Sequence, residues 1–127
     1  MKLLPATFGR MFAIQEILVI TENQNSESLS KIFKDSFSHD MKVDNNLKNK
    51  ILLHYKKHKE ELEKTFENYE IKKSSNLFKS FFYSMKIESE FLKKEIAIIW
   101  SEYKKLAELF FHEKEINALK AILNNSC

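Results

Sequence analysis

The scarcity of chain-turning residues limits the folds open to this sequence more than any other feature. It contains one glycine and one proline, and both, Gly9 and Pro5, lie ahead of the first long apolar run. Tight hairpins and strand ends usually carry such residues. Downstream, apolar residues instead recur every three or four positions, which is the period of an α-helix. We therefore expect an all-α fold.

The 127 residues are expected to form a single domain, residues 1–127. A chain of this length hides roughly two-thirds of its unfolded surface, which is enough for one core. Apolar residues make up 43% of the chain and charged residues 31%, as is typical of globular proteins. The only cysteine is Cys127, so we expect no internal disulfide and a cytoplasmic location. No stretch resembles a membrane span, so we expect no membrane role.

Three helices are expected in the first half of the chain. The first covers about residues 7–20 and is apolar around so much of its circumference that we expect it to be central. A short second helix covers residues 26–37, with Ser26 or Ser28 as its N-cap. The third is capped by Asp44 and has the clearest apolar stripe, made of Leu47, Ile51, Tyr55, His58, Leu62, Phe66 and Tyr69.

Three further helices are expected in the second half. The fourth carries the aromatic run near residues 77–85, and residues 87–94 lead into the fifth. The charged stretch HEKE, residues 112–115, is expected to turn the chain so that a last helix, about residues 115–124, packs back on the bundle. The fifth helix should place Trp100, Tyr103 and Phe110 inward and Lys104, Lys105 and Glu108 toward water.

The sequence offers little for catalysis or metal binding. A single glycine excludes the glycine-rich loops that hold nucleotide phosphates, and Ser101, Glu102 and His112 lie in no nucleophile motif. His54 and His58 have the four-residue spacing at which two imidazoles can share a metal, but no third ligand accompanies them. We expect a partly buried His58, a solvated His54, and neither an enzyme nor a metal or cofactor site.

The charge pattern has two interpretations. The formal net charge is only +3, but five lysines and no acid lie between Lys48 and Lys59, and glutamates follow almost at once. A half-helix of lysines can bind the phosphates of a nucleic acid. It can also be an ordinary solvated face, which is the commoner case.

Three segments, in order, resemble the NusB family of bacterial transcription antitermination factors. FGRMFAIQEIL resembles the family's opening helix, and LKNKILLHYKKHKEELEKTF stands at its long middle helix. WSEYKKLAELF, HEKE and INALKAILN occupy the places of its two closing helices and the turn between them. The positions that match the family's motifs are Arg10, Ala13, Gln15, Ile17, Leu18, Leu62, Glu63, Phe66, Glu102, Leu106, Ala107, Phe110 and Leu123.

The resemblance implies a fold and a function. Such proteins are helical bundles of two packed three-helix halves and are not enzymes. They bind boxA-like single-stranded RNA together with a small ribosomal protein, NusE, and through it act on the RNA polymerase elongation complex in antitermination and ribosomal RNA maturation. RNA lies along the N-terminal arm, the middle of the domain and the turn before the last helix. Carried to this chain, the RNA-binding residues are Lys2, Arg10, Lys72, Lys73 and Lys120.

The sequence also departs from the family pattern. The family's arm is rich in arginine, whereas here only Lys2 and Arg10 remain, and Ala118 replaces the aromatic of the last helix. Arginine binds phosphate with two donors, and an aromatic ring can stack on a base. These departures leave open an alternative, a helical protein-interaction module without RNA binding. A continuous basic surface joining Arg10, Lys72, Lys73 and Lys120 would favour RNA, and separated cations would favour the alternative.

Overall fold

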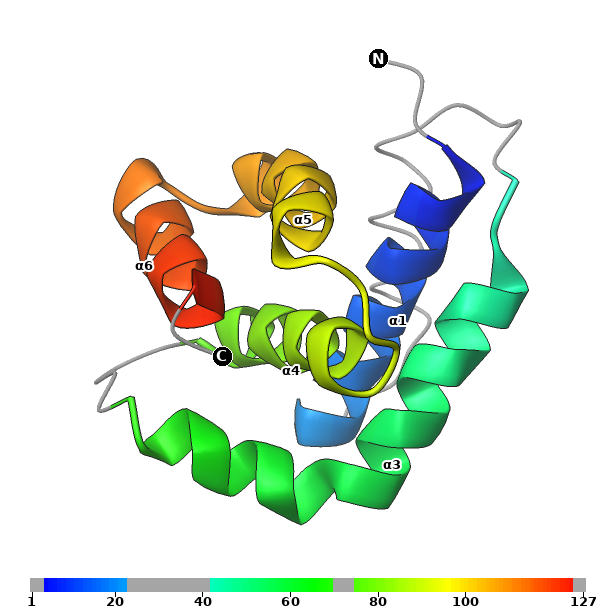
Figure 1. The fold of residues 1–127 in the computed structure, drawn as a ribbon, viewed down its shortest axis with the longest axis horizontal. Coiled ribbons are helices and arrows are strands. Elements are labelled where there is room, and N and C mark those ends of the chain that lie inside the picture. The colour runs from blue at the N-terminus through cyan, green and yellow to red at the C-terminus, as the bar shows by residue number, and fades with distance from the viewer. Residues whose placement is uncertain (1–3, 23–41, 70–74, 125–127) are drawn as a thin grey trace.

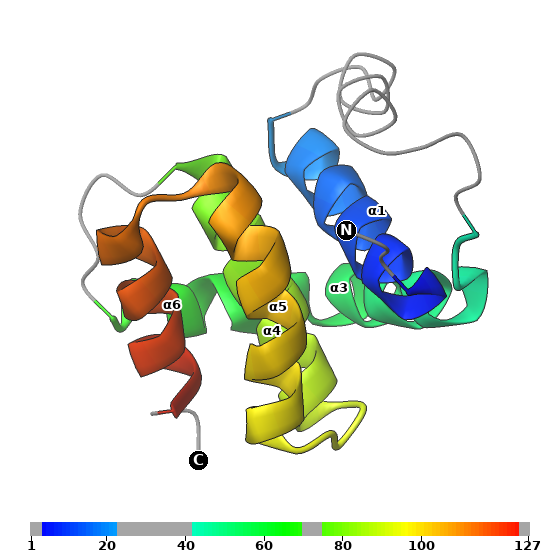
Figure 2. The same cartoon turned by 90° about the horizontal axis from the view of Figure 1, so that it is seen from above.

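The computed structural model of the chain describes residues 4–22, 42–69 and 75–124. This part of the chain is all-α, as expected, and its helices pack into one bundle (Figures 1 and 2). The short helix expected at residues 26–37 lies outside the described residues. The helices that the structure describes are α1 (Pro5–Glu22), α3 (Asn45–Glu67), α4 (Asn76–Glu90), α5 (Ile96–Phe110) and α6 (Glu113–Asn124).

Helix α4 lies at the centre of the bundle and contacts each of the other four described helices. Its residues from Ser80 to Glu88 are all buried. Helix α1 is also enclosed over most of its length, but it contacts only α3, α4 and α5. The expectation that the first helix is apolar and buried is thus confirmed, but the position at the centre belongs to α4.

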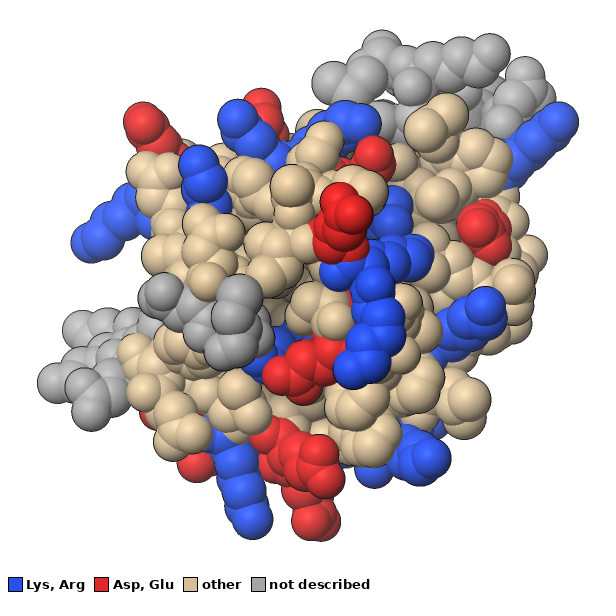
Figure 3. All heavy atoms as spheres, viewed as in Figure 1, with Lys and Arg blue, Asp and Glu red and all other residues tan. Residues whose placement is uncertain are grey.

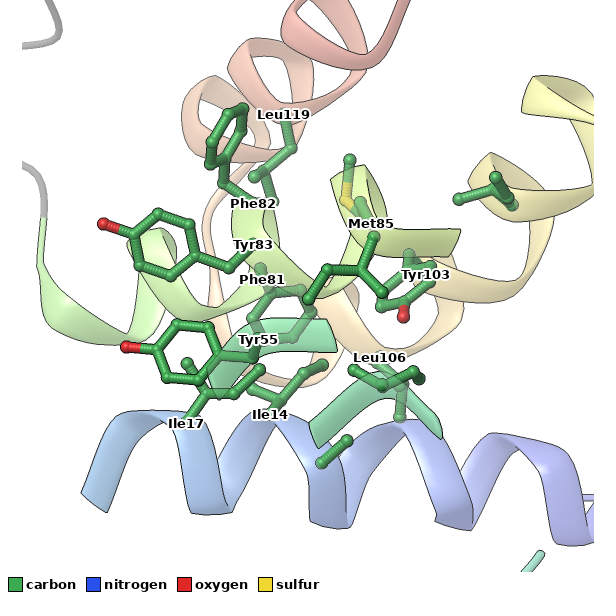
Figure 4. Close-up of a cluster of buried hydrophobic side chains, with 14 of the residues drawn as sticks. Ile14, Ile17, Tyr55, Phe81, Phe82, Tyr83, Met85, Tyr103, Leu106 and Leu119 are labelled. Atoms are coloured by element: carbon green, nitrogen blue, oxygen red, sulfur yellow. The ribbon is translucent and has the colours of Figure 1, made fainter. Parts of the chain in front are cut away.

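The core forms where the helices meet on α4, and aromatic rings fill much of it (Figure 4). Phe81, Phe82 and Tyr83 extend from α4 in different directions toward α1, α3, α5 and α6. Rings such as Phe66 and Phe82 meet edge to face, 5.1 Å apart, which is a favourable geometry for aromatic pairs. The stripe expected on α3 and the inward side expected on α5 are both confirmed, with Tyr103 fully buried and Trp100 and Phe110 partly buried.

Side-chain caps set the starts of two helices. Asp44 accepts a hydrogen bond from the Leu47 amide at 3.0 Å, and Ser75 accepts one from the Phe78 amide at 3.1 Å. Each satisfies an amide that has no partner within the helix. The cap expected at Asp44 is confirmed.

Two helix boundaries differ from those expected. Helix α4 continues to Glu90, so the connection to α5 is only residues 91–95. Helix α6 begins at Glu113, so most of HEKE is helical, and the break is confined to Phe111 and His112. Glu113 and Glu115 lie in the first turn of α6, where acidic side chains interact favourably with the helix dipole.

Helix α3 bends at His58, where the backbone leaves the helical region with φ −116° and ψ 18°. Before the bend the helix lies against α1, and beyond it the helix runs along α4 (Figure 1). The bend therefore lets one long helix cover two neighbours that point in different directions.

Gly9 marks the closest approach of α1 to the start of α3. A Cβ atom built on Gly9 would lie 2.6 Å from the backbone oxygen of Asp44. The Asp44 amide also donates to the Pro5 oxygen at 2.9 Å. Because backbone cannot move aside as a side chain can, this crossing needs a residue without a side chain.

The C-terminal half, α4 to α6, packs as a three-helix unit, with α1 and α3 beside it. The third helix that the NusB-like arrangement requires in the N-terminal half falls outside the described residues. No helix in the ranges 4–22, 42–69 and 75–124 combines the length and apolar character needed to cross a membrane.

Candidate nucleic-acid interface

Two of the five cations assigned to RNA binding lie in the described part of the chain. Lys2, Lys72 and Lys73 lie outside it. Arg10 is on α1 and Lys120 is on α6, two helices that make no contact with each other and lie on opposite sides of α4 (Figures 1 and 2). The structure therefore does not bring Arg10 and Lys120 onto one surface.

Arg10 faces the inside of the molecule and is only 5% exposed. Its guanidinium donates to both oxygens of Glu88, with Nε at 2.8 Å from Oε2 and a terminal nitrogen at 3.0 Å from Oε1. A second carboxylate, Glu102, lies 3.8 Å away. Such a two-point pair uses the planar donors that would otherwise bind a phosphate. Arg10 is therefore held as an internal ion pair, in contrast to the exposed role that the sequence suggested.

Glu88 joins Arg10 to the rest of the bundle. Its side chain is fully buried and also accepts from Lys94 Nζ at 2.8 Å. Burial alone would raise the pKa of Glu88, but hydrogen bonds and charge from Arg10, with help from Lys94, lower it. Tyr103 lies beside this pair, hydrogen-bonds Ser84, and has its pKa raised by burial and by the Glu88 charge. We call Arg10, Glu88, Lys94 and Tyr103 the Arg10–Glu88 cluster.

Exposed lysines lie on several parts of the described surface, and the densest run of them is on α3, between Lys50 and Lys59. Within the described residues, none of the lysines in this run has an acidic partner within 4 Å. Lys50 and Lys57 are seven residues apart, so they lie on the same side of the helix, and Leu53 between them is 63% exposed. We call the exposed set the α3 lysines; it consists of Lys50, Lys56, Lys57 and Lys59.

The connection between α4 and α5 adds cations close to the bend of α3. Phe91, the first residue after α4, stacks on His58, which places the connection against the bend. Lys93 follows in the left-handed region at φ 57° and is exposed. In Figure 3, lysine and arginine side chains lie over this connection at the centre of the view and over α3 on the right, with acidic side chains beside them. Charge that is separate in the sequence is thus close in the fold.

The two histidines adopt a geometry that does not suit a shared metal ion. Their rings are stacked with centroids 5.8 Å apart and planes only 11° from parallel. Ring nitrogens donate their lone pairs in the ring plane, so parallel stacked rings do not direct them to one point. Among the described residues no group of three or more His, Cys, Asp and Glu could hold a metal ion.

The histidines differ from expectation in one respect. His58 is partly buried, as expected, but His54 is partly buried as well rather than solvated. Its Nδ1 is enclosed and has no hydrogen-bond partner within the described part of the chain. Burial, followed by the nearby His58 and Lys57, lowers the pKa of His54.

Comparisons with protein-family models, curated proteins and solved structures find no match to this chain. The fold and the surface described above are therefore the grounds on which a function is assigned.

Proposed function

We propose that this protein binds single-stranded RNA and acts with a small ribosomal protein, as a transcription antitermination or ribosomal RNA maturation factor. The observation that carries the proposal is the exposed set of α3 lysines, which have no acidic partner in the described part of the chain. The order of the NusB-like segments adds support. The role is one of binding and not of catalysis.

The charge of this surface suits weak binding that a partner strengthens. Each lysine that neutralises a phosphate releases a counterion, and affinity rises with the number of such contacts. Lys50, Lys56, Lys57 and Lys59 supply few contacts, and lysine lacks the two-point grip of arginine. A second protein that adds contacts to the same RNA would raise the affinity without a change in this chain.

The cations assigned from the resemblance do not all have the same role in this proposal. Lys120 is exposed on α6 and remains a candidate for a peripheral phosphate contact. Lys2, Lys72 and Lys73 remain predictions from the sequence. Arg10 is given a structural role, because its guanidinium is already paired with Glu88.

Fluorescence anisotropy with a labelled boxA-like RNA at two salt concentrations tests the proposal, with and without the small ribosomal protein. We expect weak binding that tightens with the partner and weakens as salt rises. Replacing Lys50, Lys56 and Lys57 with glutamine should flatten the salt dependence by about three charges. The matched control replaces Lys104 and Lys105, two exposed lysines of α5, and should change the slope less. Affinity that is undetectable even in the complex, or that rises with salt, would contradict RNA binding.

The alternative, a protein-interaction module, is favoured by the separation of Arg10 from Lys120, because separated cations are what a chain without RNA binding is expected to show. Helix α5 adds a second feature. Ile98 and Leu109 are 53% and 50% exposed and lie about three turns apart on the same side of the helix. Lys105 lies between them on that side, so the two side chains would serve a partner as two separate contact points and not as one apolar patch. A pull-down with and without ribonuclease separates the two functions. Partners that resist ribonuclease but are lost with Ile98→Ser and Leu109→Ser would favour the module.

A further inference from the structure

Two aromatic rings of α3 and a third from the connection between α4 and α5 stack at the bend of α3. Phe91 lies 4.0 Å from His58 and 5.1 Å from His54, centroid to centroid, with planes within 9° and 5° of parallel. The two histidines are themselves nearly parallel. We call His54, His58 and Phe91 the ring cluster. Most other aromatic pairs in the described core meet edge to face instead.

The ring cluster is reachable from solvent. All three residues are partly exposed, and the side chain of His58 is 20% exposed. At the bend the surface is hollowed by about 410 Å³, with a lining of Lys56, Lys57, His58, Lys59, Glu60 and Glu61. His58 is the one ring of the cluster that lines this hollow, where it lies among three lysines and two glutamates.

We propose that the ring cluster is the base-binding element of the RNA interface, where an unpaired base stacks on the exposed rings while neighbouring lysines hold the adjoining phosphates. This inference rests on the proposed function. Aromatic side chains bind single strands in this way because every base has a flat π-face, whereas bases in a duplex are already stacked. Phosphate contacts come from Lys56, Lys57 and Lys59 on α3 and from Lys93 on the connection.

The lowered pKa of His54, one of the three rings, is consistent with this arrangement. Burial lowers the pKa of His54, and His58 and Lys57 lower it further, so its imidazole is neutral near pH 7. The proposal also favours RNA over an acidic peptide. An acidic peptide would pair with the lysines, but it would draw no benefit from three parallel rings.

The test uses the full chain and a labelled 12-nucleotide single-stranded RNA, with 2-aminopurine replacing one base in a second probe. Phe91→Leu should weaken binding about 5- to 150-fold, which corresponds to the loss of one stacked base. It should leave the salt dependence unchanged. Lys57→Gln should do the opposite, with a small loss of affinity and a salt slope lower by about one. The fluorescence of 2-aminopurine should be quenched by the unaltered protein and not by Phe91→Leu.

A pair of variants at His58 separates stacking from damage to the bend. His58→Phe keeps a flat ring and should retain most of the affinity, whereas His58→Leu should weaken binding as Phe91→Leu does. Thermal unfolding, monitored by circular dichroism, identifies a variant that has lost its fold. Among folded variants, a higher RNA affinity with Phe than with Leu at residue 58 shows that the flat ring itself binds the base. Lys104→Gln, at an exposed position of α5, a helix that does not contact α3, is the control for a distant charge.

The outcomes distinguish this inference from the function on which it rests. If the unaltered protein binds no RNA in any condition, both the proposed function and the role of the ring cluster are rejected. If it binds RNA, but Phe91→Leu and His58→Leu bind with the same affinity and quench equally, only the ring cluster is overturned. Binding of an acidic peptide that depends on the rings as strongly as RNA does would also overturn it.

Discussion

The Arg10–Glu88 cluster and the ring cluster both have aromatic rings next to cations, but the arginine is buried and paired at the first and the lysines are exposed at the second. In the first, Arg10 and Glu88 are almost completely removed from water and satisfy each other. In the second, Lys56 and Lys57 stay in water beside partly exposed rings. A buried charge is costly unless it is paired, whereas an exposed charge is available to a ligand. The role of a cation here follows from its surroundings and not from its place in a motif.

The largest expected effect comes from breaking the buried pair. Glu88→Gln leaves the enclosed Arg10 guanidinium with only the more distant Glu102 carboxylate, and Lys94 loses its charged partner too. We expect a loss of about 3–5 kcal/mol in the free energy of unfolding, measured by urea denaturation. Replacing the pair together, with Arg10→Met and Glu88→Leu, should recover much of that loss. A single variant as stable as the unaltered protein would show that the pair is not isolated from water.

The next largest effect is expected from acid, which should lower the stability of the protein at a different pH for each cluster. The pKa of Glu88 is lowered below its ordinary 4.5, so the unfolded chain takes up that proton first. Its contribution to stability is complete above about pH 4.5 and is lost as the pH falls through the folded-state pKa. The pKa of His54 is lowered below 6.5, so a smaller loss should begin as the pH falls below about 6.5. Thermal unfolding across pH 3–8 should show both steps, and His54→Gln should remove only the shallow one.

A smaller change tests how far the Arg10–Glu88 cluster extends. Tyr103→Phe removes the hydroxyl that hydrogen-bonds Ser84 and keeps the buried ring. Ser84 is fully buried and then loses this hydrogen-bond partner, at an expected cost of about 1–3 kcal/mol. The double variant Tyr103→Phe, Ser84→Ala should be more stable than the single one, and urea denaturation measures both. If Tyr103→Phe were as stable as the unaltered protein, the hydrogen bond between the two hydroxyls would contribute nothing to stability.

The smallest expected effect on stability is at the exposed cations. Lys57→Gln should change the free energy of unfolding by less than about 0.5 kcal/mol, because the side chain is exposed and has no acidic partner among the described residues. The same variant should lower RNA affinity. A large loss of stability at Lys57 would break the comparison, because it would give this lysine a structural role like that of Arg10.

Sequence patterns predicted most of the helices because they depend on local features. The apolar stripe from Leu47 to Phe66 and the cap at Asp44 are short-range signals, and both are present in the structure. The end of α4 was placed too early because Lys86, Glu88 and Glu90 interrupt the apolar pattern. In the fold, two of these charges are buried and paired. A charged residue in a helix therefore does not by itself mark an exposed turn.

The candidate site was less predictable because it depends on contacts between distant residues. Nothing near Arg10 in the sequence indicates that its partner is Glu88 or that its side chain turns inward. The spacing of His54 and His58 would allow a shared metal, but the sequence predicts no metal site there. Only the contact with Phe91 shows that they form a stack. The run of lysines did carry a signal, and its two interpretations could be weighed only once its exposure on α3 was known.

The pairing of Arg10 with Glu88 also has a consequence in time. The two residues are separated by 78 positions, so a ribosome adding about 5–20 residues per second needs roughly 4–16 s between them. During that interval α1 has emerged without α4, one of the two helices against which it mainly packs. For several seconds the newborn chain can therefore pack its first helix only against α3, and the side of α1 that faces α4 is open to chaperones or to the ribosome surface.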